Sequence, residues 1–138
     1  MALVPIPQLP HIQPPTTYVD PDQIIALYTP KQHPGCAELI LNLRGADGKV
    51  RSVFADLTVA AAVLAYGPFV PVELQRITND VATDYHVRAS AIIELAPRPD
   101  GHANLWLTNG DCKAITPAAY AAVVGALAGP AVAAAGHI

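Results

Sequence analysis

The chain alternates short apolar segments with turn-forming dipeptides, a pattern typical of antiparallel strands. In the C-terminal half these segments and turns follow one another closely. The predicted strands and turns there are 87–96, Asp100-Gly101, 102–108, Asn109-Gly110 and 112–115. Such dipeptides supply the positive φ angles that tight hairpins need. Thr116 and Pro117 then predict the start of a helix over 118–128, whose apolar residues recur at three- and four-residue spacing.

The N-terminal half repeats this order of elements. The segment from Val19 to Leu27 aligns without a gap on the segment from Val87 to Leu95. Strands and a helix are predicted at 23–29, 36–43, 49–54 and 56–66, with the helix ending at Gly67-Pro68. Self-similarity over about 50 residues indicates an internal duplication, with two unrelated meanders as the alternative.

The segments outside the repeats have a different character. Residues 1–18 contain five prolines and no charged side chain, which predicts an extended Pro-rich arm and not a helix or a ladder strand. Residues 69–84 predict a linking amphipathic helix, and 131–138 form an Ala-rich tail. The predicted fold is therefore α+β: two β-β-β-α meander units, at 19–68 and 85–130, with a linking helix and an N-terminal arm.

Composition narrows the function classes. Hydrophobic residues make up 52% of the chain and charged residues 14%, which favours a homo-oligomer or a protein bound to other chains of an assembly. Eight scattered Lys and Arg residues and a net charge of −3 make a nucleic-acid partner an unfavoured expectation. No membrane-spanning segment or secretory signal is predicted, so a cytoplasmic location is expected, or the virion if the gene belongs to a phage.

Candidate chemistry is sparse, and we predict no catalytic residue, no cofactor and no metal site. His33 and Cys36 have an HxxC spacing, but His102 and Cys112 do not supply the second close pair that zinc sites show. Asp20 and its neighbour Asp22 are predicted to cap a turn. The two cysteines are expected to be reduced and structural.

The predicted partner-binding residues lie in two places. Trp106 stands between two leucines on a strand, so it points to the opposite sheet face from both and favours an interface there. The others are the aliphatic residues of the arm: Leu3, Val4, Ile6, Leu9 and Ile12. A group of cations at Arg44, Lys49 and Arg51 is the best basic spot in the chain, and a solvated hairpin edge is the simpler interpretation.

Two families resemble this pattern. The strand from Val87 to Leu95, a turn, Ala103 to Gly110 and a closing helix resemble the small FlbD-like flagellar and swarming proteins, which implies a non-enzymatic interaction module. The β-rich first half leading to a strand at Tyr85-His-Val-Arg88 also resembles the LytTR DNA-binding domain. The chain lacks the basic run that LytTR domains present there.

These observations predict a non-enzymatic structural or interaction protein. The leading interpretation is a phage virion accessory protein, a capsid decoration or minor capsid protein that binds neighbours through its arm. The alternatives are a LytTR-like nucleic-acid-binding regulator or a host-interaction protein. High alanine and proline contents with three lysines are typical of a high-GC, actinobacterial genome or one of its phages.

Overall fold

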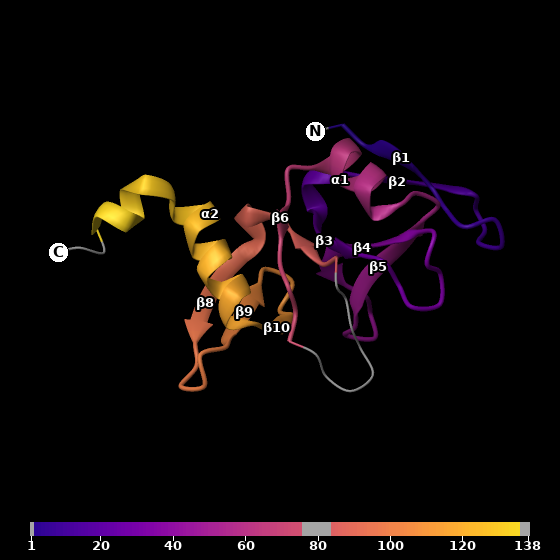
Figure 1. Ribbon diagram of the computed structural model, residues 1–138. Helices are drawn as coiled ribbons and strands as arrows, with labels where there is room; N and C mark the ends of the chain where they lie inside the picture. Colours follow the sequence, from indigo (N-terminus) through magenta and orange to yellow (C-terminus); the bar gives the residue numbers. More distant parts are fainter. Residues whose placement is uncertain (1, 76–83, 136–138) are drawn as a thin grey trace.

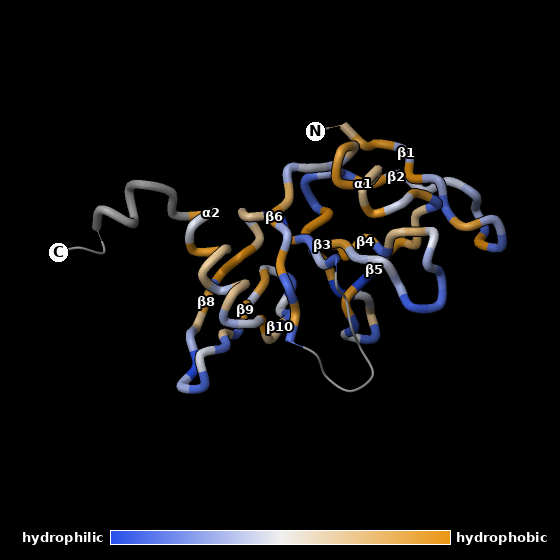
Figure 2. The backbone as a smooth tube through the Cα atoms, viewed as in Figure 1, coloured by the Kyte–Doolittle hydropathy of each residue, from blue (hydrophilic) through white to orange (hydrophobic). Residues whose placement is uncertain are grey.

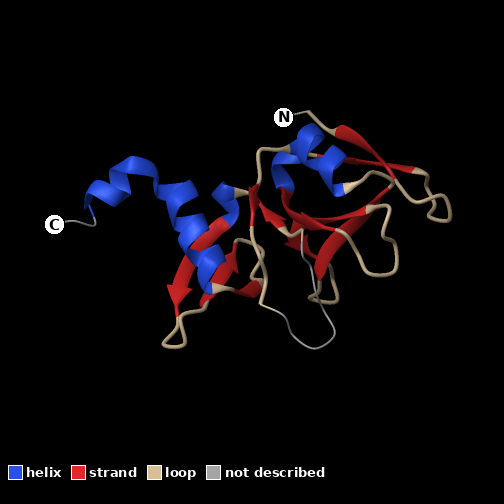
Figure 3. Cartoon of the chain, in the orientation of Figure 1, coloured by secondary structure: helices blue, strands red, loops and turns tan. Residues whose placement is uncertain are grey.

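In the residues that the structure describes, the protein is mostly β, with three antiparallel sheets and two α-helices (Figures 1 and 3). This computed structural model describes residues 2–75 and 84–135. The strands are β1 (Val4–Pro7), β2 (Thr16–Val19), β3 (Ile24–Tyr28), β4 (Ala37–Arg44), β5 (Val50–Ala55), β6 (Val70–Pro71), β7 (His86–Val87), β8 (Ile92–Pro97), β9 (Ala103–Leu107) and β10 (Cys112–Ile115). The helices are α1 (Val59–Tyr66) and α2 (Pro117–Ala135), with short 3-10 turns η1 (Pro21–Gln23) and η2 (Ala89–Ala91).

The five-stranded sheet, in the order β5-β4-β3-β7-β6, is buried on both faces. On one face, Leu27 and Leu39 pack with α1 and the N-terminal hairpin. On the other face, Ile25 and Ile40 pack with β9 and α2. Because both faces are covered, β3 is an almost continuous apolar run instead of an alternating one. Figure 2 shows apolar segments where these layers meet and polar residues at the turns.

The small sheet, in the order β10-β9-β8, has only its inner face covered. Leu105, Leu107 and Ile115 on this face pack against Ala119 and Val123 of α2. The Thr116 hydroxyl accepts a hydrogen bond from the Ala119 amide at 3.1 Å, so the predicted helix start is confirmed. The helix continues beyond its predicted end because the residues after Pro130 are mostly alanine, the strongest helix former.

The N-terminal segment is a hairpin, so the prediction of an extended arm without ladder pairing is wrong. Strands β1 and β2 pair antiparallel, with Ile6 opposite Thr17. Pro5 and Pro7 alternate with Ile6 and point outward, an arrangement that an edge strand tolerates. The hairpin is tied to the first sheet, since the Asp56 amide donates to the Pro7 carbonyl at 2.7 Å.

The connection at 69–84 does not begin as the predicted linking helix. Val70–Pro71 forms β6, which pairs with β7 and extends the first sheet. Leu74 forms an isolated bridge with Ile115, so this stretch is held by backbone pairing to both halves. The rest of the predicted helix, 76–83, lies outside the described residues, as does the end of the predicted tail, 136–138.

The same local geometry occurs twice, at a constant offset. The 3-10 turns η1 and η2 precede β3 and β8, and each strand carries a bulge after its first residue. Ile24 pairs with Leu41 in the first sheet, and Ile92 pairs with Leu107 in the second. The predicted single strand at 87–96 is therefore broken, because the chain turns through η2 before β8 begins.

Candidate functional site

Two hairpin turns from the two halves of the chain meet at Arg44. The Arg44 Nε donates to the Asn109 carbonyl at 2.8 Å, and its Nη1 donates to the Gly48 carbonyl at 2.7 Å. The buried Asn109 amide donates to the Leu41 carbonyl at 3.3 Å. Arg44 and Asn109 therefore clamp the β4–β5 turn to the β9–β10 turn.

The glycines of these turns are required by backbone geometry. Gly48 has φ +78° and Gly110 has φ +88°, backbone angles that residues with a side chain rarely adopt. A Cβ at Gly110 would also lie 2.9 Å from Arg44 Nη2, a distance that forces the guanidinium to move. The Asp-Gly and Asn-Gly dipeptides thus predicted these turns correctly, but they gave no sign of the contact between them.

The β4–β5 turn carries the cations that the sequence singled out. Residues 44–51 hold three cations and one carboxylate, a local charge of +2 in a chain of net charge −3. Lys49 and Arg51 are exposed, whereas Arg44 is committed to two carbonyls. The Asp47 carboxylate accepts from the Lys49 amide at 3.0 Å and shapes the turn. The turn therefore presents two cationic side chains to solvent.

A second arginine joins the two halves. Arg88, which follows β7, donates from Nε to the Ile24 carbonyl and from Nη2 to the carbonyls of Pro21 and Tyr66, each at 2.8 Å. Its guanidinium also stacks on the Phe69 ring, 4.5 Å from the ring centre. Arg88 is therefore a structural cation whose side-chain donors are engaged by backbone carbonyls of this chain. The sequence offered one sign of this role, a lone arginine beside apolar strand residues.

Asp20 caps the 3-10 turn that precedes β3, and the predicted cap role is confirmed. Its carboxylate accepts a hydrogen bond from the Asp22 amide at 3.1 Å. The residue before the second 3-10 turn, η2, is Arg88, which makes no such cap. The two turns thus have similar backbone angles at their first residue but different side chains there.

The predicted partner-binding residues do not form one surface. Ile6 is fully buried and Leu9 is 8% exposed, both within this chain's own structure. Val4 and Ile12 are half-buried, and Leu3 is 61% exposed. The hairpin therefore binds its own domain through Ile6 and Leu9. Trp106 is 41% exposed on the outer face of the small sheet and lies on β9, a strand that Figure 1 shows away from the β1–β2 hairpin.

Candidate metal ligands are scattered. Among the described residues, no group of three or more His, Cys, Asp or Glu side chains could hold a metal ion. His102 lies against Asp100, 3.4 Å from Nδ1 to the carboxylate, and His33 packs on the rings of His11 and Phe54. Cys36 and Cys112 are free thiols, the first buried and the second exposed.

Burial raises the pKa of both thiols, and nearby carboxylates raise it further. A thiol with a raised pKa is protonated at neutral pH and reacts slowly. We expect a maleimide to label Cys112 more slowly than a small-molecule thiol at pH 7, and Cys36 only after unfolding. The labelling rate of Cys112 should still be rising above pH 9. Mass spectrometry of the folded protein checks this, and equal labelling of both cysteines would contradict it.

Comparisons with known proteins find similarity in fold but not in sequence. No family model matches the chain, and no curated protein matches it. A solved structure described as the LytTR DNA-binding domain of a methyl-accepting/DNA response regulator from Bacillus cereus superposes with a TM-score of 0.60. The match covers 94% of this chain and 98% of that one, at 11% sequence identity.

This match corrects several predictions. The resemblance to FlbD-like modules and the phage virion function are wrong, because 94% of the chain superposes on one LytTR DNA-binding domain. The expectation that nucleic acid is an unlikely partner is contradicted as well, because the matched structure is described as a DNA-binding domain. The second resemblance, to LytTR domains, agrees with the match. The match is to a DNA-binding domain, in agreement with the prediction that the chain is not an enzyme. None of the helices in the described part of the chain is long and apolar enough to cross a membrane. The chain has the fold of a LytTR DNA-binding domain.

Proposed function

We propose that the chain is a DNA-binding protein that acts in the cytoplasm. The observation that carries this proposal is the superposition on a LytTR DNA-binding domain over nearly the full length of both chains. Fold likeness alone is an argument by analogy, so the surface must supply the cations that phosphates require. The β4–β5 turn is the part of the described structure that best meets this requirement.

The number of available cations limits the strength of such binding. Arg88 is held by backbone carbonyls, and Arg98 is paired with Asp100 at 2.8 Å. Lys49 and Arg51 make no side-chain hydrogen bond or ion pair within the described residues, and they flank Val50, which pairs with Arg44 across the β4–β5 hairpin. A protein that neutralises few phosphates has a shallow salt dependence, about −0.9 in log K against log salt for each contact.

We expect binding of a fluorescein-labelled duplex pool with a randomised centre at low NaCl, measured by fluorescence anisotropy. Lys49→Ala and Arg51→Ala should each weaken binding and reduce the salt slope by about 0.9, because each removes one phosphate contact. Lys31→Ala is the matched control, since Lys31 is an exposed cation in the loop at the opposite end of β4. Its binding and salt slope should equal those of the wild type.

Two outcomes would contradict the proposal. One is the absence of any anisotropy change at the lowest salt concentration in which the protein is folded. The other is an equal loss of binding in Lys31→Ala, which would mean that only net charge matters and that the β4–β5 turn is not the contact surface. Recovery of a preferred sequence from the bound pool would show that bases are read as well as phosphates.

We also infer that 19–68 and 85–130 are two copies of one β-β-β-α unit, with 1–18, 69–84 and 131–138 outside the repeats. Three matches at a constant offset support this: the 3-10 turns, the strand starts and the bulges. The φ and ψ angles of Asp20 are −70° and 116°, and those of Arg88 are −75° and 126°. In each unit a three-stranded meander leads to a helix, which is the order that the sequence predicted.

A further inference from the structure

Asn109 is a buried asparagine that stands directly before a glycine. No other amide or charged side chain is buried in residues 2–75 and 84–127, and no other asparagine of the sequence precedes a glycine. Asparagine is a thermolabile residue, because the backbone nitrogen of the next residue can attack its side-chain carbonyl carbon. A glycine in that next position has no side chain to obstruct the attack. Asn109 therefore has the local sequence in which deamidation occurs most readily.

Deamidation of Asn109 would proceed through a succinimide ring. The Gly110 nitrogen gives up its proton and forms a bond to Asn109 Cγ, and the Cγ–Nδ2 bond breaks as Nδ2 leaves as ammonia with that proton. Water then opens the ring, adding its hydroxyl to a ring carbonyl carbon and its proton to the Gly110 nitrogen. Cleavage of the bond at Cγ gives aspartate, and cleavage at the backbone carbonyl carbon gives isoaspartate. The overall change exchanges ammonia for water, with no oxidation or reduction.

The folded chain binds the groups that this reaction needs. Asn109 Nδ2 donates to the Leu41 carbonyl at 3.3 Å, and its Oδ1 accepts from the Asp111 amide at 2.9 Å. The Gly110 amide, which would have to lose its proton, donates to the Leu107 carbonyl at 2.9 Å. The reaction therefore requires the turn to open, since the Gly110 proton and the leaving nitrogen are both held.

Arg44 holds the peptide group that joins Asn109 to Gly110. Its Nε donates at 2.8 Å to the Asn109 carbonyl, which belongs to the same planar peptide group as the Gly110 nitrogen. The guanidinium also lies against Gly110, where a Cβ would stand 2.9 Å from Nη2, and its Nη1 is bound to the Gly48 carbonyl. Rotation of this peptide group toward the Asn109 side chain therefore requires Arg44 to release it.

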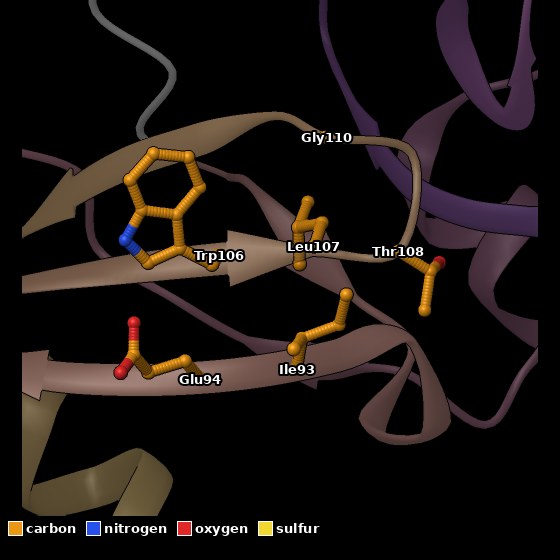
Figure 4. Close-up of a pocket in the computed structure, with 6 residues that line it drawn as sticks. All are labelled: Ile93, Glu94, Trp106, Leu107, Thr108 and Gly110. Carbon is orange, nitrogen blue, oxygen red and sulfur yellow. The ribbon is translucent and has the colours of Figure 1, made fainter.

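Access of water does not limit the reaction. Thr108 and Gly110, on either side of Asn109, are exposed and line a hollow of about 520 Å³ (Figure 4). What separates Asn109 from hydrolysis is thus the set of hydrogen bonds that hold its side chain and its peptide group. Proteins open such local structure at a lower free energy than that of global unfolding.

We propose that Asn109 is a deamidation site that the folded chain keeps unreactive, and that Arg44 sets how often the site opens. Either product changes the contact between the β4–β5 and β9–β10 turns. An ionised aspartate has no proton to donate to the Leu41 carbonyl, and isoaspartate lengthens the backbone of the turn. Deamidation of an opened chain therefore weakens this contact when the chain closes again. The inference is independent of the proposed DNA binding and is tested without DNA.

The test follows deamidation of the full chain by peptide mass spectrometry, at a mildly alkaline pH that favours loss of the amide proton. Trypsin releases Asn104 and Asn109 in one peptide, 89–113, so Asn104, which precedes a leucine, is an internal control. In urea, Asn109 should deamidate at least about tenfold faster than in the folded wild type, because the closed turn binds the reacting groups. Asn104 should remain slow in both states.

Arg44→Ala should raise the folded-state rate at Asn109 by about tenfold, since loss of a hydrogen bond from a charged donor makes the turn easier to open. Arg51→Ala is the matched control, because Arg51 is an exposed arginine of the same hairpin that makes no side-chain hydrogen bond within the described residues. Its rate at Asn109 should equal that of the wild type. Circular dichroism confirms that each variant is folded, and Arg44→Lys, which lacks the planar fork, replaces Arg44→Ala if the latter unfolds.

Equal rates at Asn109 in the folded wild type and in urea would overturn the proposal, since the fold would not protect the site. An unchanged rate in a folded Arg44 variant would overturn the role of Arg44. A wild-type chain that has been deamidated in urea and refolded should unfold at a lower urea concentration than the unmodified chain. An equal midpoint would overturn the stated effect on the contact between the turns.

Discussion

Replacing Arg88 with alanine is expected to lower the free energy of unfolding by about 3 kcal/mol, the largest loss that we predict for a single polar side chain. The guanidinium is bound to three backbone carbonyls of the first unit and stacks on Phe69. A hydrogen bond to a charged group contributes about 1.5–3 kcal/mol, and removal of the donor leaves carbonyls without a partner. Part of the loss is recovered because Arg88 is only partly buried and water can reach the site.

The urea midpoint of unfolding measures this loss. Arg98→Ala is the matched control, since Arg98 forms an ion pair with Asp100 at the surface, and such pairs contribute about 0–1 kcal/mol. Arg88→Lys should fall between the two, because an ammonium retains the charge but lacks the planar fork that reaches several carbonyls. If Arg88→Ala and Arg98→Ala unfold at the same urea concentration, the clamp does not join the two units.

The elements that the sequence predicted best are those with local signals. Asp47-Gly48, Asp100-Gly101 and Asn109-Gly110 placed three hairpin turns, and Thr116-Pro117 placed the start of α2. In each case a residue type and a backbone conformation are linked by chemistry within a few positions. The basic spot on the β4–β5 turn was visible for the same reason, because its members are neighbours in sequence.

The elements that the sequence did not predict depend on contacts between distant residues. Arg44 and Asn109 are 65 positions apart, and Arg88 is 64 positions from Ile24. No local sequence pattern could therefore predict the hydrogen bonds between them. Strand β6 is only two residues long and is defined by its pairing with β7. The sequence also gave no sign that the second face of β3 is buried, because that face is covered by β9 and α2, which come much later in the chain. Local chemistry therefore predicts the turns and the helix start, whereas contacts between distant residues decide how the sheets and helices pack together.

Replacing Ile6 with alanine is expected to lower the free energy of unfolding by about 2–4 kcal/mol, because the side chain is fully buried between the hairpin and the first sheet. The truncation leaves a cavity in a close-packed core that also contains Val19, Leu39 and residues of α1. Deleting residues 2–15 should destabilise the domain more, since it removes β1 and exposes the same core. An arm that served only a partner would leave thermal stability unchanged.

Leu3→Ala is the control for this experiment. Leu3 lies on the same segment, one residue before β1, but it is 61% exposed, so its truncation removes little buried area. Thermal unfolding of the wild type and the two variants separates the alternatives. If Ile6→Ala and Leu3→Ala melt together with the wild type, the hairpin does not contribute to the core. A low melting temperature for Ile6→Ala alone means that the Pro-rich segment is an integral layer of the domain. Ile6 packs the hairpin against one face of the five-stranded sheet. Ile40, on the opposite face of that sheet, packs against the layer formed by β9 and α2.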